Sequence, residues 1–139
     1  MKLLVFKLMA LASLLLFSGC GDSVKSGDDY LSIELKSDDF DNNITQTGLA
    51  IQAKDDIIIR SVSINRGNCP VGLSPMAGMV YSMANSYNLP TGIKYTLEKD
   101  LPLDLAFSQS ILIPINCNLN SVLETTIETN QGTFTWTWK

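Results

Sequence analysis

The chain of 139 residues is about one ordinary domain long, and its formal charge of −4 comes from 10 Lys and Arg against 14 Asp and Glu. Its only arginines are Arg60 and Arg66, so no basic patch is available and we exclude nucleic acid as a partner. Because the chain has no histidine, it cannot form a Ser-His-Asp or Cys-His catalytic unit. We therefore expect neither an enzyme nor a bound cofactor.

The N-terminal residues have the features of an export signal. Two lysines flank the start of an apolar run that ends in the small pair Ser18-Gly19. The run is too short to span a bilayer comfortably. A basic flank, an apolar stretch and small residues before a cleavage point are the parts of a secretory signal. Residues 1–19 are therefore predicted to be a signal peptide.

The signal leads into Leu16-Phe17-Ser18-Gly19-Cys20. This run resembles the lipobox of bacterial lipoproteins, although Phe17 stands where leucine is more usual. The resemblance implies that Cys20 becomes the N-terminus, is acylated on sulfur and nitrogen, and anchors the protein to a membrane. Each buried CH₂ adds about 0.8 kcal/mol, so several acyl chains anchor stably. Gly21 follows the cysteine where inner-membrane lipoproteins often carry Asp. The same resemblance therefore implies the outer membrane of a Gram-negative cell envelope, on its periplasmic side.

The composition changes after the expected cleavage point. Loss of Lys2 and Lys7 with the signal leaves 8 basic residues against 14 acidic ones, which is a net charge of −6. Residues 20–29 are small and polar, which predicts a flexible tether that holds the domain off the membrane. Residues 30–139 are then expected to form the folded domain.

Within this domain apolar and polar residues alternate, with the period of half-buried strands rather than of helices. The alternation or strand-like composition covers residues 30–36, 48–54, 57–64, 91–98, 101–107, 111–117, 122–129 and 133–138. In the third segment we expect Ile58, Val62 and Ile64 to share the core face. Pro114 cannot donate a ladder hydrogen bond, which predicts that its strand lies at a sheet edge or is bulged there.

The last two segments flank Asn130-Gln131-Gly132, which predicts a hairpin. Phe134, Trp136 and Trp138 would then face the core, with threonines facing outward. Many short strands separated by turn signals predict an all-β domain. We expect a small antiparallel β-sandwich of immunoglobulin-like architecture, with a small barrel as the alternative.

Two cysteines remain in the expected domain, Cys69 and Cys117. Export would place them in an oxidising compartment, where such a pair in a small domain forms a disulfide more often than a metal site. Zinc would need two more ligands, and the chain has no histidine. We therefore predict a disulfide, and closing a loop of this length stabilises a fold by about 4 kcal/mol.

One segment inside the disulfide loop breaks the alternation and is rich in methionine. Met76, Met79, Met83 and Tyr87 recur every three or four residues, so a short helix would align them in one stripe. Such a stripe usually packs on a sheet, and core packing is our first interpretation. Binding of a protein partner by these residues and Tyr81 is the second, because methionine is an adaptable contact residue. Binding of Cu(I) by the thioethers is the third.

A further motif surrounds Asn43. Asn43-Ile44-Thr45 is a glycosylation sequon on an expected loop. Asp39, Asp41 and Asn43 also match the start of an EF-hand loop, but Ile44 occupies the position of its glycine and Ala50 that of its bidentate glutamate. A calcium loop of this type is therefore not expected, and we assign the chain no metal.

Two functions remain after these exclusions. The first is a lipid-anchored adaptor or assembly subunit that docks a larger complex of the cell envelope. The second is an envelope module that binds a ligand, a metal or a foreign hydrolase, in the last case as an inhibitor. A closed sandwich with an apolar surface patch favours the first, and a barrel with a polar-lined mouth favours the second.

Overall fold

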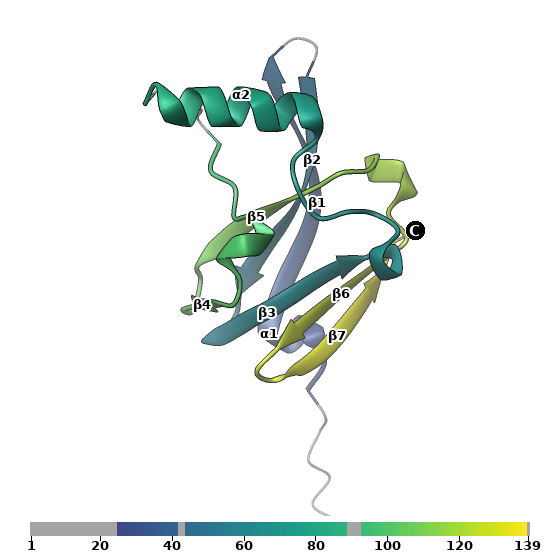
Figure 1. Cartoon of the computed structure of the whole chain (residues 1–139). Helices are drawn as coiled ribbons and strands as arrows, with labels where there is room; N and C mark the ends of the chain where they lie inside the picture. The colour runs from purple at the N-terminus through teal and green to yellow at the C-terminus, as the bar shows by residue number, and fades with distance from the viewer. Residues whose placement is uncertain (1–24, 42–43, 89–92, 139) are drawn as a thin grey trace, which may run out of the picture.

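A computed structural model describes residues 25–41, 44–88 and 93–138 (Figure 1). The chain forms two antiparallel sheets, one with the strand order β1-β2-β5 and one with the order β4-β3-β6-β7. The sheets face each other across a shared apolar core. This arrangement confirms the prediction of an all-β domain and of a small antiparallel sandwich, with two separate sheets in place of a closed barrel.

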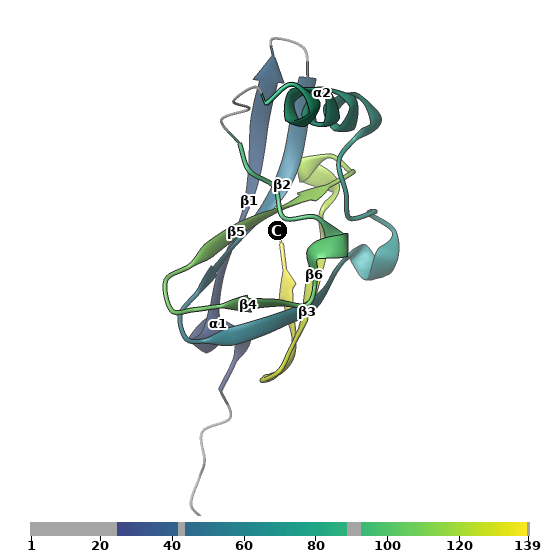
Figure 2. The same cartoon turned by 60° about the vertical axis from the view of Figure 1, so that its left-hand side comes forward.

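The strands are short except for the first two. They are β1 (Leu31–Asp41), β2 (Ile44–Ala53), β3 (Ile57–Ile64), β4 (Leu103–Leu105), β5 (Ser110–Ile115), β6 (Glu124–Thr129) and β7 (Gly132–Thr137). The α-helices are α1 (Gly27–Tyr30) and α2 (Pro75–Ser86), and the 3-10 turns are η1 (Asn65–Gly67), η2 (Glu98–Asp100) and η3 (Leu119–Ser121). In both views α1 and α2 lie at opposite ends of the molecule (Figures 1 and 2).

Both sheets supply the core. Its fully buried side chains include Leu49 and Ile51 on β2, Ile59 on β3, Ile113 on β5 and Ile127 on β6. Along β2, β3 and β6 these residues alternate with less buried ones, which is the pattern that predicted the strands. Burying one such side chain contributes about 1.5–3 kcal/mol. The core therefore accounts for much of the stability of the sandwich.

The core face of β3 changes at a bulge between Ile59 and Ser61. The buried residues of this strand are Ile57, Ile59, Val62 and Ile64. One extra residue in a strand exchanges its two faces, so the residues that point inward before the bulge are one position out of phase with those after it. The prediction that Ile58 shares the core face is therefore wrong, and Ile58 is only half-buried.

Two other expected strands are shorter than predicted or absent. Residues 93–97 form no strand, although Thr96 N donates to Leu112 O of β5 at 2.8 Å. This segment crosses from one sheet to the other, so it cannot stay in register with either; residues 91–92 lie outside the described ranges. The strand expected at 101–107 is reduced to the three residues of β4, and Phe107 beyond it is 68% exposed.

β5 is an edge strand, as Pro114 predicts. Pro114 O accepts a hydrogen bond from Gly72 N at 2.8 Å, on the side of β5 that faces away from β2. In an antiparallel strand the N–H and C=O of one residue point to the same side. The missing N–H of Pro114 therefore faces the free edge, and no ladder hydrogen bond is lost.

The predicted disulfide and hairpin are both present. Cys69 and Cys117 are bonded, with their Cα atoms 5.6 Å apart. Because Cys69 follows β3 and Cys117 follows β5, the bridge ties the two sheets together. β6 and β7 form the hairpin, with Thr129 opposite Gly132 across a two-residue loop. The rings of Trp136 and Trp138 contact the core while staying half-exposed.

α1 occupies the last part of the segment that we expected to be a tether. Gly27 lies against Cβ of Phe134 and the ring of Trp136, and a Cβ atom at Gly27 would come within 2.6 Å of Trp136. Trp136 Nε1 donates to Asp28 Oδ1, and Lys54 Nζ donates to Asp28 O, each at 2.7 Å. α1 is thereby fixed against β7. Cys20 and the expected signal peptide lie outside the described ranges, within which no helix is long and apolar enough to cross a membrane.

Candidate functional site

The methionine-rich segment forms a helix, as its spacing predicts. Ser74 is the N-cap of α2, and its Oγ accepts a hydrogen bond from Ala77 N at 3.3 Å. Pro75 occupies the first helical position, where a missing N–H costs nothing. The cap and the proline fix the beginning of α2 and therefore the direction in which its apolar stripe points.

The stripe faces solvent rather than the sheet. The exposed fractions are 61% for Met76, 62% for Met79, 55% for Met83 and 72% for Tyr87. The buried residues of α2 are Ala77 and Ala84, which lie on another side of the helix. The interpretation of the stripe as core packing is therefore wrong. Alanines allow a close approach to the sheet, so the large side chains are not needed for it. We name Met76, Met79, Met83 and Tyr87 the α2 face.

Tyr81 differs from the other predicted partner-binding residues. Its ring packs edge-on against Tyr95, with the ring centroids 5.8 Å apart. It is only partly exposed and holds α2 to the crossing segment. A second attachment is made by buried Gln46, whose Oε1 accepts from Ser74 N and whose Nε2 donates to Ile115 O, each at 2.9 Å. These contacts hold α2 in place without using the α2 face.

The chemistry of the α2 face is apolar and uncharged, since α2 contains no Asp, Glu, Lys or Arg. Thioethers and a phenol ring can fill irregular apolar pockets on another molecule. The thioethers of Met76, Met79 and Met83 share this face, as the copper interpretation also requires. No group of three or more His, Cys, Asp or Glu gathers as a metal site within the described ranges.

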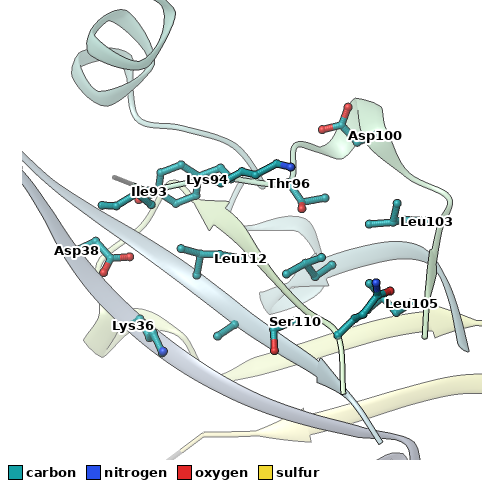
Figure 3. Close-up of a pocket in the computed structure, with 14 residues that line it drawn as sticks. Lys36, Asp38, Ile93, Lys94, Thr96, Asp100, Leu103, Leu105, Ser110 and Leu112 are labelled. Atoms are coloured by element: carbon teal, nitrogen blue, oxygen red, sulfur yellow. The ribbon is translucent and has the colours of Figure 1, made fainter. Parts of the chain in front are cut away.

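A groove of about 880 Å³ lies elsewhere on the molecule (Figure 3). Lys36, Ala50 and Leu112 lie on the outer face of the three-stranded sheet, since they alternate with residues of the core face. Residues 93–96 and β4 supply the other walls. Ala50 and Leu112 make an apolar floor, while Lys36, Asp38, Lys94 and Asp100 add charges of both signs.

Asp38 and Tyr95 are two polar residues that line the groove. Asp38 Oδ2 is buried and accepts no hydrogen bond from the described residues. Burial raises the pKa of Tyr95 from 10 to about 12, and the Asp38 carboxylate and Tyr81 add to the rise. Tyr95 therefore keeps its proton to a higher pH than a solvent-exposed tyrosine does. The groove could hold a small amphipathic molecule that donates a hydrogen bond to Asp38.

The groove could not be predicted from the sequence. Its residues come from β1, β2, β5, β4 and the crossing segment, and none of them forms a motif with its neighbours. Only the pairing of Ala50 with Leu112 brings part of the floor together. Two residues predicted from motifs, Cys20 and Asn43, lie outside the described ranges.

The comparisons with known proteins add no family to these features. No protein-family model matches the chain, and neither a curated protein nor a solved structure is detectably similar to it. Function must therefore be argued from the α2 face and the groove.

Proposed function

We propose that the chain is a non-enzymatic envelope lipoprotein, anchored by Cys20 in the outer membrane of a Gram-negative bacterium and facing the periplasm. In this proposal it is an adaptor or assembly subunit for a larger envelope complex, which it binds through the α2 face. The observation that carries the proposal is that three methionines and a tyrosine on one side of a helix are each more than half exposed.

The α2 face is unusual for the surface of a protein that works alone. Burying one large apolar side chain contributes about 1.5–3 kcal/mol, and here that contribution is not used for folding. Contiguous exposed apolar residues commonly mark interaction sites, and methionine and tyrosine are enriched at protein interfaces. The absence of charges on α2 fits the centre of an interface, where charged residues are depleted.

The position of α2 fits a partner on the side away from the anchoring membrane. The chain enters the fold at α1, and α2 lies at the opposite end (Figure 2). β1 runs between these ends with 11 residues, which at about 3.3 Å per residue span about 35 Å. The chain between Cys20 and Lys25 reaches at most about 18 Å when fully extended. A domain held by α1 would therefore present α2 to the periplasm.

The test is capture of bound proteins from native membranes after reversible cross-linking. The full-length wild type is compared with a variant carrying Met76→Ser, Met79→Ser and Tyr87→Ser. The proposal expects one envelope complex to be recovered with the wild type and lost with the variant at equal abundance. Recovery of the same proteins by both would overturn docking through the α2 face.

A second function, binding of a small ligand, is favoured by the unpaired Asp38 Oδ2 in the groove. A buried carboxylate oxygen without a partner costs free energy that a ligand donor would remove. A fragment library followed by amide NMR shifts is expected to move the signals of Thr96 and Leu112. Leu112→Trp, which fills the groove, should abolish these shifts. Shifts confined to α2, or none, would argue against this function.

A further inference from the structure

The two open sheets leave four edge strands among the described residues: β1, β4, β5 and β7. An edge strand presents unpaired backbone N–H and C=O groups that can pair with a strand of another chain. Soluble proteins usually protect such edges with charges, prolines, bulges, short strands or a covering segment. The four edges of this sandwich differ in that protection.

Three of the edges are protected. β4 has only three residues, and Asp104 is its centre. β5 contains Pro114 and is covered where Leu112 O accepts from Thr96 N and Pro114 O from Gly72 N. β1 carries the exposed charges of Glu34 and Lys36 and has a register shift near its end. Pairing of another strand along these edges is hindered by geometry or charge.

β7 lacks all of these devices. Its sequence, Gly-Thr-Phe-Thr-Trp-Thr, has no charge and no proline, and its register with β6 is unbroken. α1 contacts the side chains of Phe134 and Trp136, but no described residue forms a backbone hydrogen bond to the free edge. Trp138 N donates to Leu123 O, so even-numbered residues pair with β6. The backbone groups of Thr133, Thr135 and Thr137 therefore point to the free edge.

We propose that this edge pairs with β7 of a second copy of the chain, antiparallel and about a two-fold axis at Thr135. The sequence of β7 is self-complementary in that register. Thr133 lies opposite Thr137 of the second copy, and Phe134 lies opposite Trp136 of the second copy. Thr–Thr and aromatic pairs are favourable cross-strand neighbours, and the strand has no charge to repel its copy. All the free N–H and C=O groups of Thr133, Thr135 and Thr137 are then paired.

The symmetry of the β7 sequence favours a second copy of the chain over an unrelated strand. A two-fold interface must match its own surface, and the three threonines and two aromatic rings are arranged symmetrically about Thr135. The result is one continuous sheet through both copies, which leaves α2 free in each. Failure of this pairing would therefore leave the proposed docking function untouched.

The test is cysteine cross-linking of the full-length chain in native membranes. Directly opposed residues that exchange hydrogen bonds have Cα atoms about 5.5 Å apart, within the range for a disulfide. Thr135→Cys should form a covalent dimer on oxidation, because this residue faces its own copy. Thr133→Cys and Thr137→Cys should not do so singly, but the double variant should. The wild type reports the background.

All three threonines are exposed, so the cysteine variants should fold normally, which circular dichroism checks. In sedimentation experiments on the full-length protein in detergent, the wild type is expected to be a dimer and Thr135→Lys a monomer. The inference is overturned if Thr135→Cys forms no dimer, if all three single variants cross-link equally, or if Thr135→Lys sediments like the wild type.

Discussion

The interior of the sandwich and the outer side of α2 both carry large apolar side chains, but in opposite environments. Ile51, Ile59 and Ile127 are fully buried between the sheets, whereas Met76 and Met79 on α2 are mostly exposed. Each set is regular in sequence, with period two in the strands and three to four in the helix. Apolar periodicity shows which side chains share a face, but not what that face contacts.

Apolar residues contribute to folding stability in the sandwich and, in our proposal, to binding on α2. In the sandwich, removal of a side chain leaves a cavity and lowers the free energy of unfolding. On α2, removal changes only a solvated surface, so the free energy of unfolding should stay constant while binding is lost. Substitutions in the two regions should therefore give opposite patterns of stability and binding.

The largest effect is expected from the bridge that joins the sheets. Replacing Cys69 and Cys117 with serine releases a loop with a sequence separation of 48 residues and should lower the free energy of unfolding by about 4 kcal/mol. Urea denaturation followed by circular dichroism measures the change. An unaltered midpoint would show that the bridge does not constrain the unfolded chain.

The next effect is expected from the core of β6. Ile127→Ala should lower the free energy of unfolding by about 3 kcal/mol, because the cavity lies between the two sheets. Leu123→Ala is the matched control, since Leu123 is 65% exposed just before β6. The control should change the same quantity by less than about 0.5 kcal/mol. Equal losses for both would contradict the assignment of the core.

A smaller effect is expected from Tyr95 at high pH. Its pKa is raised from 10 to about 12, so the unfolded chain loses the phenol proton at a lower pH than the folded chain. Stability should therefore fall between these two pH values and be unaffected by Tyr95 below them. Tyr95→Phe removes this loss, and the difference between the pH profiles of the two proteins measures it. Identical profiles would contradict the raised pKa.

The smallest effect on stability is expected from the α2 face. Met76→Ser, Met79→Ser and Tyr87→Ser should each change the free energy of unfolding by less than about 0.5 kcal/mol, because the side chains contact mainly solvent. Thermal unfolding of the combined variant checks this. A large loss would mean that the α2 face packs within the protein.

Much of the sandwich could be predicted from the sequence because its determinants are local. The presence of β1 and β2, the terminal hairpin and the edge position of Pro114 follow from alternation and from proline chemistry. β1 continues to Asp41 and β2 begins at Ile44, beyond the predicted segments 30–36 and 48–54. The face of β3 could not be predicted, since the bulge after Ile59 depends on its pairing with β6. Residues 93–97 alternate like a strand, but their path between the sheets is set by tertiary structure.

The candidate sites could be predicted only in part. The spacing of Met76, Met79, Met83 and Tyr87 gave the helix and the common face, but the small residues on another side, Ala77 and Ala84, are those that pack. The groove brings Lys36 and Leu112 together through strand pairing over a long separation in the sequence. No local pattern encodes such an assembly.

The most direct test of the central claim is photo-cross-linking in intact cells, with a photoreactive residue at Met79 or at Asn85. Both positions are exposed on α2, and their separation of six residues places them about 120° apart around its axis. The proposal predicts a discrete cross-linked partner from position 79 and none from position 85. The same products from both positions, or none from position 79, would contradict docking through the α2 face.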